Sequence, residues 1–428
     1  MNKKISLGAA IFLMLIFMAA TVSMTMIYSQ RNFNNKVRDL KDRESRYSKI
    51  AEIDNYVQNR YIGTIVAEDL TDATAAGFIA GIGDPYAKYY DKTSYDLLLA
   101  DYSGNSVQIG IVTEKSESGY IKVTEVYPDS PAQAAGIQPD DLIVKIDDTD
   151  ISSENYAQAL DMLKGEPGTK MSIVLRRGVE EDTLEMTRRF VETPSVSAEM
   201  LENNIGFIKF KEFNDTTPDQ FNKRVNRLID EDVQALVFDV RGVKTGVLRS
   251  VAQVLDKLLP EGVIVSSTDK DGNTTVLETS DATEVALPMA VLMNEKTSGE
   301  AELFAQAIKD YEKGKLVGIK TAGKGTAQTI IPLTDGSAIK LTTARYNPPV
   351  SLSYDGIGVK PDFEVKMNEE QLEFAVGDPK LDAQLKKAIE VVMAGIKQAE
   401  SQAESEAESQ AESNADETSS VESSSEEK

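Results

Sequence analysis

Between residues 195 and 363, short apolar runs alternate with segments of helical spacing. The clearest runs are residues 235–240, which read ALVFDV, and residues 285–293. A nearly continuous apolar run is typical of a strand that is buried on both faces. Strands that alternate with helices predict an α/β core with a partly parallel sheet. Further strands are expected at 205–213, 263–266, 315–319 and 337–343, and helices at 217–229, 247–259 and 381–396.

Composition excludes several kinds of chemistry. The 428 residues are enough for two or three domains. The chain has no Cys and no His, which excludes Ser-His-Asp and Cys-His catalysis and argues against a zinc site. Any hydrolytic proton transfer must therefore use Lys, Asp or Glu, and we expect no metal and no cofactor. Because the net charge is -24, we do not expect the chain to bind nucleic acid.

The two ends of the chain differ from its middle. Residues 1–4 are basic, and residues 5–28 are apolar or small without a charge. This run is long enough to span a bilayer, so we expect a single-pass anchor with the bulk of the chain outside the cytoplasm. A cleavable signal peptide is the alternative. Residues 398–428 hold ten acidic residues and one Lys in low-complexity sequence, and this tail is expected to be disordered.

Residues 294–328 carry the strongest candidate for a catalytic site. An apolar run ends at residue 293, and Thr297-Ser298-Gly299 then forms a turn before an amphipathic helix. Many hydrolases display their nucleophile on such a turn between a strand and a helix. A second short strand leads to Gly323-Lys324-Gly325, and this lysine could serve as the base for a nearby hydroxyl.

Residues 101–188 have the features of a small β-rich domain that resembles a PDZ domain. The resemblance rests on Ile109-Gly110-Ile111, on the segment 127–132, YPDSPA, and on later Gly-containing motifs at 135–137 and 163–169. Gly110 would let a peptide backbone approach the strand edge, where an incoming C-terminal strand could add. Ile109, Gly110 and Ile111 are therefore the predicted peptide-binding residues. A PDZ domain that only packs as a lid is the alternative.

From about residue 50 to 365, the chain resembles the carboxyl-terminal processing (tail-specific) serine peptidases, which use a serine–lysine dyad. The resemblance implies a ClpP/crotonase-like α/β core with an inserted PDZ domain. It also implies that Lys324 is the base, that Gln328 orients it, and that Gly246 and the backbone of Glu300 bind the oxyanion. The matching positions are Glu302, Asp310, Thr321, Gly323, Lys324, Gly325, Gln328 and the closing segment 356–362.

Three positions depart from the pattern of that family. Gly299 stands where the nucleophilic serine is expected, and Glu300 replaces a small residue after it. Thr245 replaces the first glycine of the pair in the oxyanion loop. Glu300 is expected to keep Lys324 protonated, through an ion pair. Ser298 could act instead of residue 299, but it points about 100° away on a helix, and Thr297 with Glu300 reads as a capping box.

These observations leave hypotheses of different classes. The first is an anchored pseudopeptidase, which binds protein C-termini without cutting them; whether the chain is an enzyme stays open. The second is an active serine endopeptidase that uses Ser298 and Lys324, and the third is a structural envelope protein. Protein or peptide C-termini and the membrane are the expected partners, and a homo-oligomer is allowed. The expected domains are 1–30 (membrane anchor or signal), 31–95 (helical), 96–190 (PDZ), 191–375 (peptidase-like core), 376–397 (C-terminal helix) and 398–428 (acidic tail).

Overall fold

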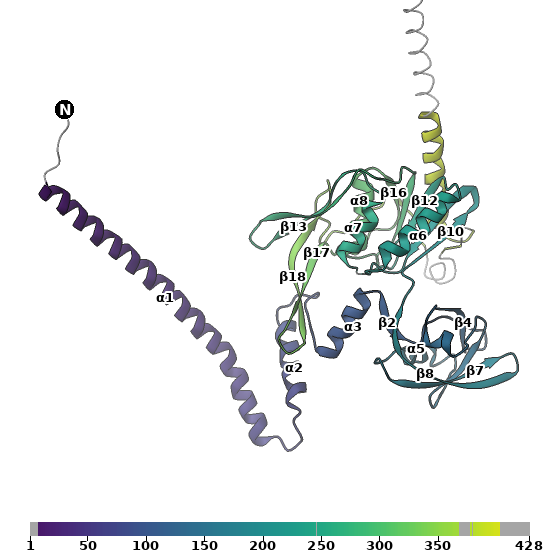
Figure 1. The fold of residues 1–428 in the computed structure, drawn as a ribbon, viewed down its shortest axis with the longest axis horizontal. Coiled ribbons are helices and arrows are strands. Elements are labelled where there is room, and N and C mark those ends of the chain that lie inside the picture. Colours follow the sequence, from purple (N-terminus) through teal and green to yellow (C-terminus); the bar gives the residue numbers. More distant parts are fainter. Residues whose placement is uncertain (1–6, 245, 368–376, 379, 403–428) are drawn as a thin grey trace, which may run out of the picture. The chain divides into compact units, whose positions relative to one another are not determined.

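The computed structural model describes residues 7–244, 246–367, 377–378 and 380–402. Two compact units are present, Met1–Thr74 and Ala75–Lys428. The first unit consists mainly of α1, Leu7–Arg60, one helix that continues across the predicted domain boundary at residue 30 (Figure 1). The helix α2, Ala67–Ala80, begins in the first unit and ends in the second.

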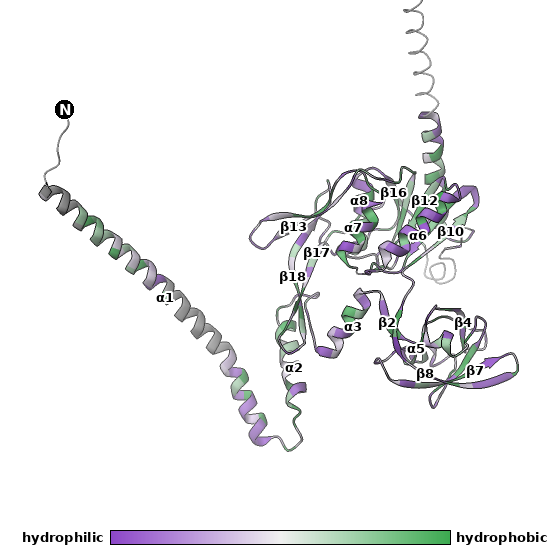
Figure 2. Cartoon of the chain, viewed as in Figure 1, coloured by the Kyte–Doolittle hydropathy of each residue, from purple (hydrophilic) through white to green (hydrophobic). Residues whose placement is uncertain are grey.

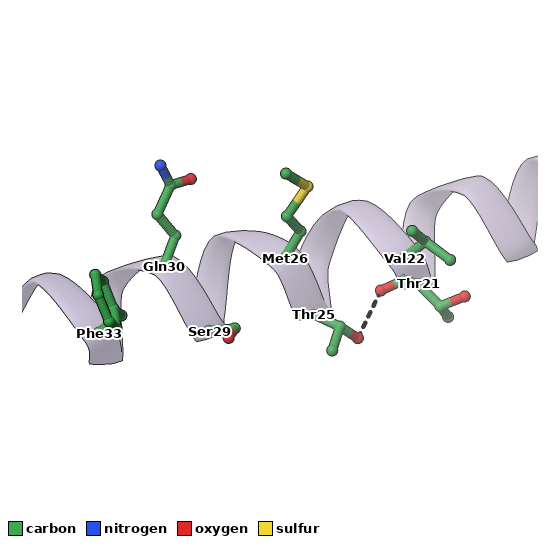
Figure 3. A pocket seen from close by; sticks show the side chains of 7 residues that line it. All are labelled: Thr21, Val22, Thr25, Met26, Ser29, Gln30 and Phe33. Carbon is green, nitrogen blue, oxygen red and sulfur yellow. Dashed lines mark hydrogen bonds between the residues drawn. The ribbon is translucent and has the colours of Figure 1, made fainter.

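Helix α1 carries exposed apolar side chains in its first half. Val22 is 62% exposed, Met26 67% and Phe33 66%. Figure 3 shows these side chains with Thr21, Thr25, Ser29 and Gln30 along one stretch of the helix, where the Thr25 hydroxyl donates to the Thr21 carbonyl at 2.8 Å. In the part of the chain that the structure describes, no helix has the length and apolar character needed to cross a membrane. The predicted anchor at residues 5–28 is not supported by this finding, and residues 5 and 6 lie outside the described part.

The β-rich domain expected between residues 96 and 190 is present. Its main sheet has the order β3-β4-β5-β7-β8, with β6 beside β5. Strand β3 is an edge strand, since it pairs only with β4. A second small sheet of β2 and β9 joins the domain to the rest of the chain. The elements are α3 (Lys92–Tyr102), β2 (Asn105–Gln108), β3 (Ile111–Lys115), β4 (Ile121–Val126), α4 (Pro131–Ala134), β5 (Leu142–Ile146), β6 (Thr149–Asp150), α5 (Tyr156–Met162), β7 (Lys170–Arg177), β8 (Glu180–Thr187) and β9 (Arg189–Glu192).

The α/β core is built on a six-stranded sheet in the order β10-β11-β12-β15-β16-β19. Strands β11, β12, β15, β16 and β19 are parallel to their neighbours, and β10 is antiparallel to β11. The predicted partly parallel sheet is therefore confirmed. The strands are β10 (Val196–Leu201), β11 (Ile205–Phe210), β12 (Ala235–Asp239), β15 (Met289–Met293), β16 (Gly314–Gly318) and β19 (Phe363–Glu364), and the 3-10 turn η1 (Glu202–Asn204) joins β10 to β11.

Alternating side chains of the sheet build a core on each face. Leu236 and Phe238 pack among the buried residues of α6 (Thr217–Asp230), α7 (Leu248–Asp256) and α8 (Glu300–Asp310). Ala235 and Val237 face the other way and pack with Leu385 of the helix at residues 383–402. This follows from the two-residue period of a strand. Helix α6 carries both apolar and polar residues along its length, as a helix on one face of a sheet requires (Figure 2).

A second, antiparallel sheet was only partly predicted. Its order is β1-β18-β13-β14, and β17 pairs with β18. The sequence predicted strands at 263–266 and 337–343 but missed β1, β14 and β17. Strand β1 has only three residues, and β14 and β17 are largely exposed or half-buried and lack a continuous apolar run. The strands are β1 (Lys88–Tyr90), β13 (Gly262–Asp269), β14 (Thr274–Ser280), β17 (Thr326–Pro332) and β18 (Ala338–Asn347).

The C-terminal helix is longer than the predicted 381–396. It runs through residue 402, so the first residues assigned to the acidic tail are helical. Ala, Glu and Gln in this segment are good helix formers, which explains the extension. The rest of the predicted disordered tail, residues 403–428, lies outside the described residues.

Candidate functional site

The candidate site lies at the carboxyl ends of three adjacent parallel strands. The loop after β12 carries Gly246, the turn after β15 carries Ser298 and Gly299, and the loop after β16 carries Lys324. Because β12, β15 and β16 are neighbours with the same direction, these loops meet at one edge of the sheet. The sequence predicted these residues for one site, and the fold brings them together.

Gly299, not Thr297, is the residue that begins α8. Its backbone has φ 68° and ψ -125°, a conformation that favours glycine and that a nucleophile turn also imposes on serine. The predicted capping box of Thr297 with Glu300 is wrong. Thr297 is fully buried, and its hydroxyl donates to the Val240 carbonyl at 2.9 Å. Thr297 thus ties the turn to the end of β12 and leaves the helix to be capped by another side chain.

That side chain belongs to Glu302, which is fully buried. Its carboxylate accepts hydrogen bonds from the backbone N–H of Gly299 at 3.0 Å, Gly323 at 2.7 Å and Lys324 at 2.7 Å. The hydroxyl of Thr321 donates to the same carboxylate. Four donors from two loops therefore converge on one carboxylate, which fixes the turn before α8 against the loop that carries the lysine.

Lys324 is held in a buried position and is only 7% exposed. Burial lowers the pKa of its ammonium below the ordinary 10.5, and the negative charge of Glu300 opposes this shift only in part. Glu300 thus favours the protonated form of Lys324, as expected, but burial has the larger effect on the pKa. The two side chains form no ion pair within 4.0 Å, and the ammonium instead lies 5.1 Å from the centre of the Tyr86 ring. The direction of the shift is the one that a general base needs.

Gly299 faces this lysine directly. A Cβ atom built on Gly299 would lie 3.7 Å from Cδ and 3.8 Å from Nζ of Lys324. Neither distance involves a clash, and the nearest other atom is the Lys244 carbonyl at 3.5 Å. A hydroxyl on such a Cβ would lie within hydrogen-bonding reach of the ammonium nitrogen. The geometry of a serine–lysine pair is thus preserved, but the hydroxyl is missing.

Glu300 occupies the place where oxyanion donors are expected. Its carboxylate accepts a hydrogen bond from the backbone N–H of Gly246 at 3.0 Å, and the Tyr346 hydroxyl lies 3.4 Å from it. Burial raises the pKa of this carboxyl above the ordinary 4.5, and Lys324 offsets only part of the shift. One predicted oxyanion donor is therefore already bonded to a side chain of the protein itself. Thr245, the other altered position of this loop, lies outside the described residues.

Ser298 and Gln328 lie near the lysine without bonding to it. Ser298 is half-buried and lines the same cavity as Lys324, while its backbone N–H donates to the Val243 carbonyl at 2.8 Å. The Gln328 amide donates to the carbonyl and hydroxyl of Thr326 at 3.0 and 2.8 Å. Among the described residues, neither makes a hydrogen bond to Lys324, so the proposed roles of Ser298 as nucleophile and Gln328 as orienting residue remain predictions.

Two residues at this site were missed by the sequence reasoning. Tyr86 ends the turn Gly83-Asp84-Pro85-Tyr86, and its backbone N–H donates to the Asp84 carboxylate at 2.9 Å. This turn places the Tyr86 ring beside Lys324. Lys340 of β18 lines the site from the second sheet. The proline-containing turn was a visible signal in the sequence, but nothing there connected it to Lys324.

In the PDZ-like domain, packing requires a glycine at residue 110, and the predicted role of Gly110 beside a bound peptide stays a prediction. Its φ is 86°, and a Cβ there would lie 2.2 Å from Cβ of Ser130, which caps α4. The domain's own α4 therefore fills the space beside Gly110. Ile109 and Ile111 are both buried in the domain core. The remaining feature that suits an added peptide strand is the unpaired edge of β3.

No cluster for a metal ion is present in the described ranges, where no group of three or more Asp and Glu side chains is suitably placed. The prediction that the protein uses no metal or cofactor is not tested by this. What the described arrangement offers chemically is a buried lysine, an anion-binding backbone N–H and a helix N-terminus, a combination typical of serine–lysine hydrolases.

Comparisons with known proteins agree with this class. A model of peptidase family S41 matches residues 204–365, and a PDZ domain model matches residues 122–177. The chain is 27% identical over 369 residues to a protein of Staphylococcus haemolyticus described as a CtpA-like serine protease, covering 85% of this chain and 74% of the relative. It is 28% identical over 335 residues to the carboxy-terminal processing protease CtpA of Bacillus subtilis, covering 76% and 70%.

A solved structure supports the fold as well. The crystal structure of a protein described as an S41 protease from Bacteroides fragilis matches with a TM-score of 0.50 and 18% identity, over 76% of this chain and 90% of that one. Residues 204–365 therefore match peptidase family S41 and residues 122–177 match a PDZ domain, and the chain is similar to proteases of the carboxy-terminal processing type. The predicted resemblance is confirmed.

Proposed function

We propose that this protein is a pseudopeptidase, in which catalysis is lost or much reduced. The observation that carries the proposal is the position of Gly299. A side chain at this residue would start 3.8 Å from Nζ of Lys324, so the reactive hydroxyl is missing from the one place that suits it. The hydrogen bond from the Gly246 backbone N–H to the Glu300 carboxylate supports the same conclusion. This N–H is a donor that an oxyanion would need.

In this proposal the PDZ domain supplies the binding activity. The unpaired edge of β3 suits a protein C-terminus that adds as an antiparallel strand. The protein would be attached to the cell membrane through residues 5–28, with its bulk outside the cytoplasm, as the basic head and the uncharged apolar run suggest. Protein C-termini are then its ligands, and nucleic acid is not.

Residual activity through Ser298 is the second candidate function, and one observation favours it. Ser298 lines the cavity that also contains Lys324, whose pKa is lowered by burial. A modest change of the turn could bring the Ser298 hydroxyl to that lysine. The protein would then be a serine endopeptidase that cuts near protein C-termini.

One experiment separates the two functions. The purified protein is incubated with an unfolded protein that has an apolar C-terminus, beside Ser298→Ala and Lys324→Ala variants. The proposal predicts no cleavage by any of the three and retained binding of C-terminal peptides. Cleavage by the wild type that disappears in both variants would establish the serine endopeptidase instead. Extraction of membranes with carbonate tests the membrane attachment separately.

A further inference from the structure

The cavity beside Lys324 is lined by an unusual number of cations. It has a volume of about 430 Å³, and five of its nine lining residues are lysines. No carboxylate is among the nine. We call this cavity the lysine pocket; its lining residues are Lys88, Lys244, Lys296, Lys324 and Lys340, with Pro85, Tyr86, Ala87 and Ser298.

The five lysines come from five separate parts of the chain. Lys88 lies on β1 and Lys340 on β18, where these two residues are also paired across the sheet. The other three follow the carboxyl ends of β12, β15 and β16. A basic run in the sequence would explain a local cluster of lysines, but no such run exists here. The tertiary fold therefore gathers the five charges at one place.

Within the described part of the chain, none of the five lysines forms an ion pair within 4.0 Å. Three of them lie over tyrosine rings instead. The ammonium of Lys324 is 5.1 Å from the Tyr86 ring centre, and those of Lys88 and Lys340 are 4.9 and 5.7 Å from the Tyr90 ring centre. Such contacts orient the ammonium groups but leave their charge in place.

Glu300, Glu302 and Asp84 act on Lys324 electrostatically, but none of them lines the pocket, and each accepts a backbone hydrogen bond. Glu302 accepts four hydrogen bonds from the two loops, and Glu300 accepts one from Gly246. Asp84 accepts one from the backbone of Tyr86. A concave surface with several unpaired cations concentrates positive potential and attracts anions. The chain as a whole has a net charge of -24, but the lining of the lysine pocket is positive, so anions are its expected ligands.

We propose that the lysine pocket binds a carboxylate-rich peptide segment, and that residues 403–428 of the same chain are its occupant. This segment holds nine acidic residues and one Lys, so its charge complements the pocket. Its other residues are mostly Ala, Ser and Gln, which are small enough to follow a narrow surface. Residues 403–428 follow the last described helix, and in extended form they reach about 90 Å, farther than a domain of this size requires.

Contacts between exposed Glu and Lys side chains are individually weak, so the binding depends on several of them together and salt weakens it. This inference concerns the same cavity as the proposed loss of catalysis. It does not depend on that loss, because binding of the tail is measured without any cleavage assay.

Zero-length carbodiimide cross-linking of the full-length protein tests the proposal, since it joins Lys and Glu side chains only when they touch. Mass spectrometry of the monomer should find residues 403–428 joined to Lys88, Lys244, Lys296 or Lys340. The variant Lys244→Glu with Lys296→Glu should reduce all tail cross-links about tenfold, and 0.5 M salt should do the same. Both lysines are exposed, so the variant keeps the fold.

A matched control makes the same change of charge at two lysines outside the pocket. The variant Lys223→Glu with Lys270→Glu replaces two exposed lysines outside the pocket and should leave the pocket cross-links unchanged. The proposal is overturned if the tail joins Lys223 and Lys270 as often as the pocket lysines, or if its cross-links appear only in dimers. It is also overturned if no cross-link joins the tail to any lysine of the pocket.

Discussion

Two sides of the candidate site differ in what remains of the peptidase. On the lysine side, the loop of residues 321–325 is tied to α8 by the four hydrogen bonds of Glu302, and Lys324 is buried in the position of a base. On the other side, the turn before α8 has Gly299 instead of a residue with a hydroxyl. The backbone N–H of Gly246 there donates its hydrogen bond to the Glu300 carboxylate. The lysine side keeps its hydrogen bonds to α8, whereas the nucleophile side has no hydroxyl at residue 299.

The difference has a physical explanation. Glu302 satisfies buried donors, so its loss would destabilise the fold whether or not catalysis takes place. A hydroxyl at residue 299 would contribute to chemistry but little to packing, since a Cβ at that position would make only ordinary contacts. Under the proposed loss of catalysis, groups that also serve folding are expected to persist, whereas groups that serve catalysis alone are free to change.

The largest expected effect is a gain of cleavage. Gly299→Ser with Glu300→Ala returns a hydroxyl beside Lys324 and frees the Gly246 N–H. We expect cleavage of an unfolded protein to rise about 100-fold or more above background, the scale of general-base catalysis. The positive φ of residue 299 costs the variant about 1–3 kcal/mol of stability.

Two further variants control this gain. Gly299→Ala with Glu300→Ala carries the same backbone strain without a hydroxyl and should stay inactive. Adding Lys324→Met to the serine variant should remove the activity again. If the serine variant is as inactive as the alanine variant, Lys324 does not act as a base for a hydroxyl at residue 299. The proposed difference between the two sides of the site is then wrong.

The second prediction concerns Glu302. Glu302→Ala leaves four donors without their acceptor in a buried place, so we expect the free energy of unfolding to fall by about 4 kcal/mol. Urea unfolding followed by circular dichroism measures this value. Glu261→Ala, at an exposed position, serves as the control and should change it by less than about 0.5 kcal/mol. A small loss for Glu302→Ala would show that the carboxylate is not the main tie between the two loops.

The third prediction tests a buried ion cluster below the same strands. Arg241 bonds to Asp239 at 2.7 Å and to Asp382 at 2.8 Å, with all three side chains buried. Arg241→Met leaves two unpaired carboxylates and should cost about 3–5 kcal/mol at neutral pH. Thermal and urea unfolding measure the loss, which an exposed substitution such as Arg249→Met should not reproduce.

The same cluster gives a pH dependence with a defined sign. Burial raises the pKa of Asp382, but the hydrogen bond and charge of Arg241 outweigh it and hold the pKa below the ordinary 3.8. A carboxyl with a lowered folded pKa contributes stability above its unfolded pKa and loses it as the pH falls through the folded pKa. The difference between wild type and Arg241→Met should therefore shrink below pH 3.8. A difference that stays constant down to acid pH would mean that Asp382 gains nothing from Arg241.

The smallest expected effect belongs to Glu300. Glu300→Gln keeps an acceptor for the Gly246 N–H and removes a buried charge, so the free energy of unfolding should change by less than about 1 kcal/mol. Burial raises the pKa of this carboxyl above 4.5, so the contribution of Glu300 to the free energy of unfolding falls as the pH rises through that raised pKa. The variant should therefore gain stability relative to wild type with rising pH. If the variant instead becomes less stable than the wild type as the pH rises, the ionised carboxylate of Glu300 stabilises the fold, as that of Glu302 does.

Much of the fold could be predicted from the sequence, because buried strands and amphipathic helices have strong periods. The strands β11, β12 and β16 and the helices α6, α7 and α8 lie where the sequence predicted them. The half-exposed strands β14 and β17 were missed, since their side chains follow no clear pattern. The cap of α8 was assigned to Thr297 because the local T-x-x-E pattern fits, but the tertiary fold uses that hydroxyl elsewhere.

By itself, the sequence determined the absence of His and Cys, the glycine at residue 299 and the lysine at residue 324, and with them the kind of chemistry that is open to this protein. Only the tertiary structure decided that Lys324 is buried enough to lower its pKa, and that Glu300 bonds to Gly246 rather than to the lysine. Only the structure gathers five distant lysines around one cavity. The reason is that residue types are local properties of a chain, whereas burial and charge proximity depend on residues far apart in the sequence.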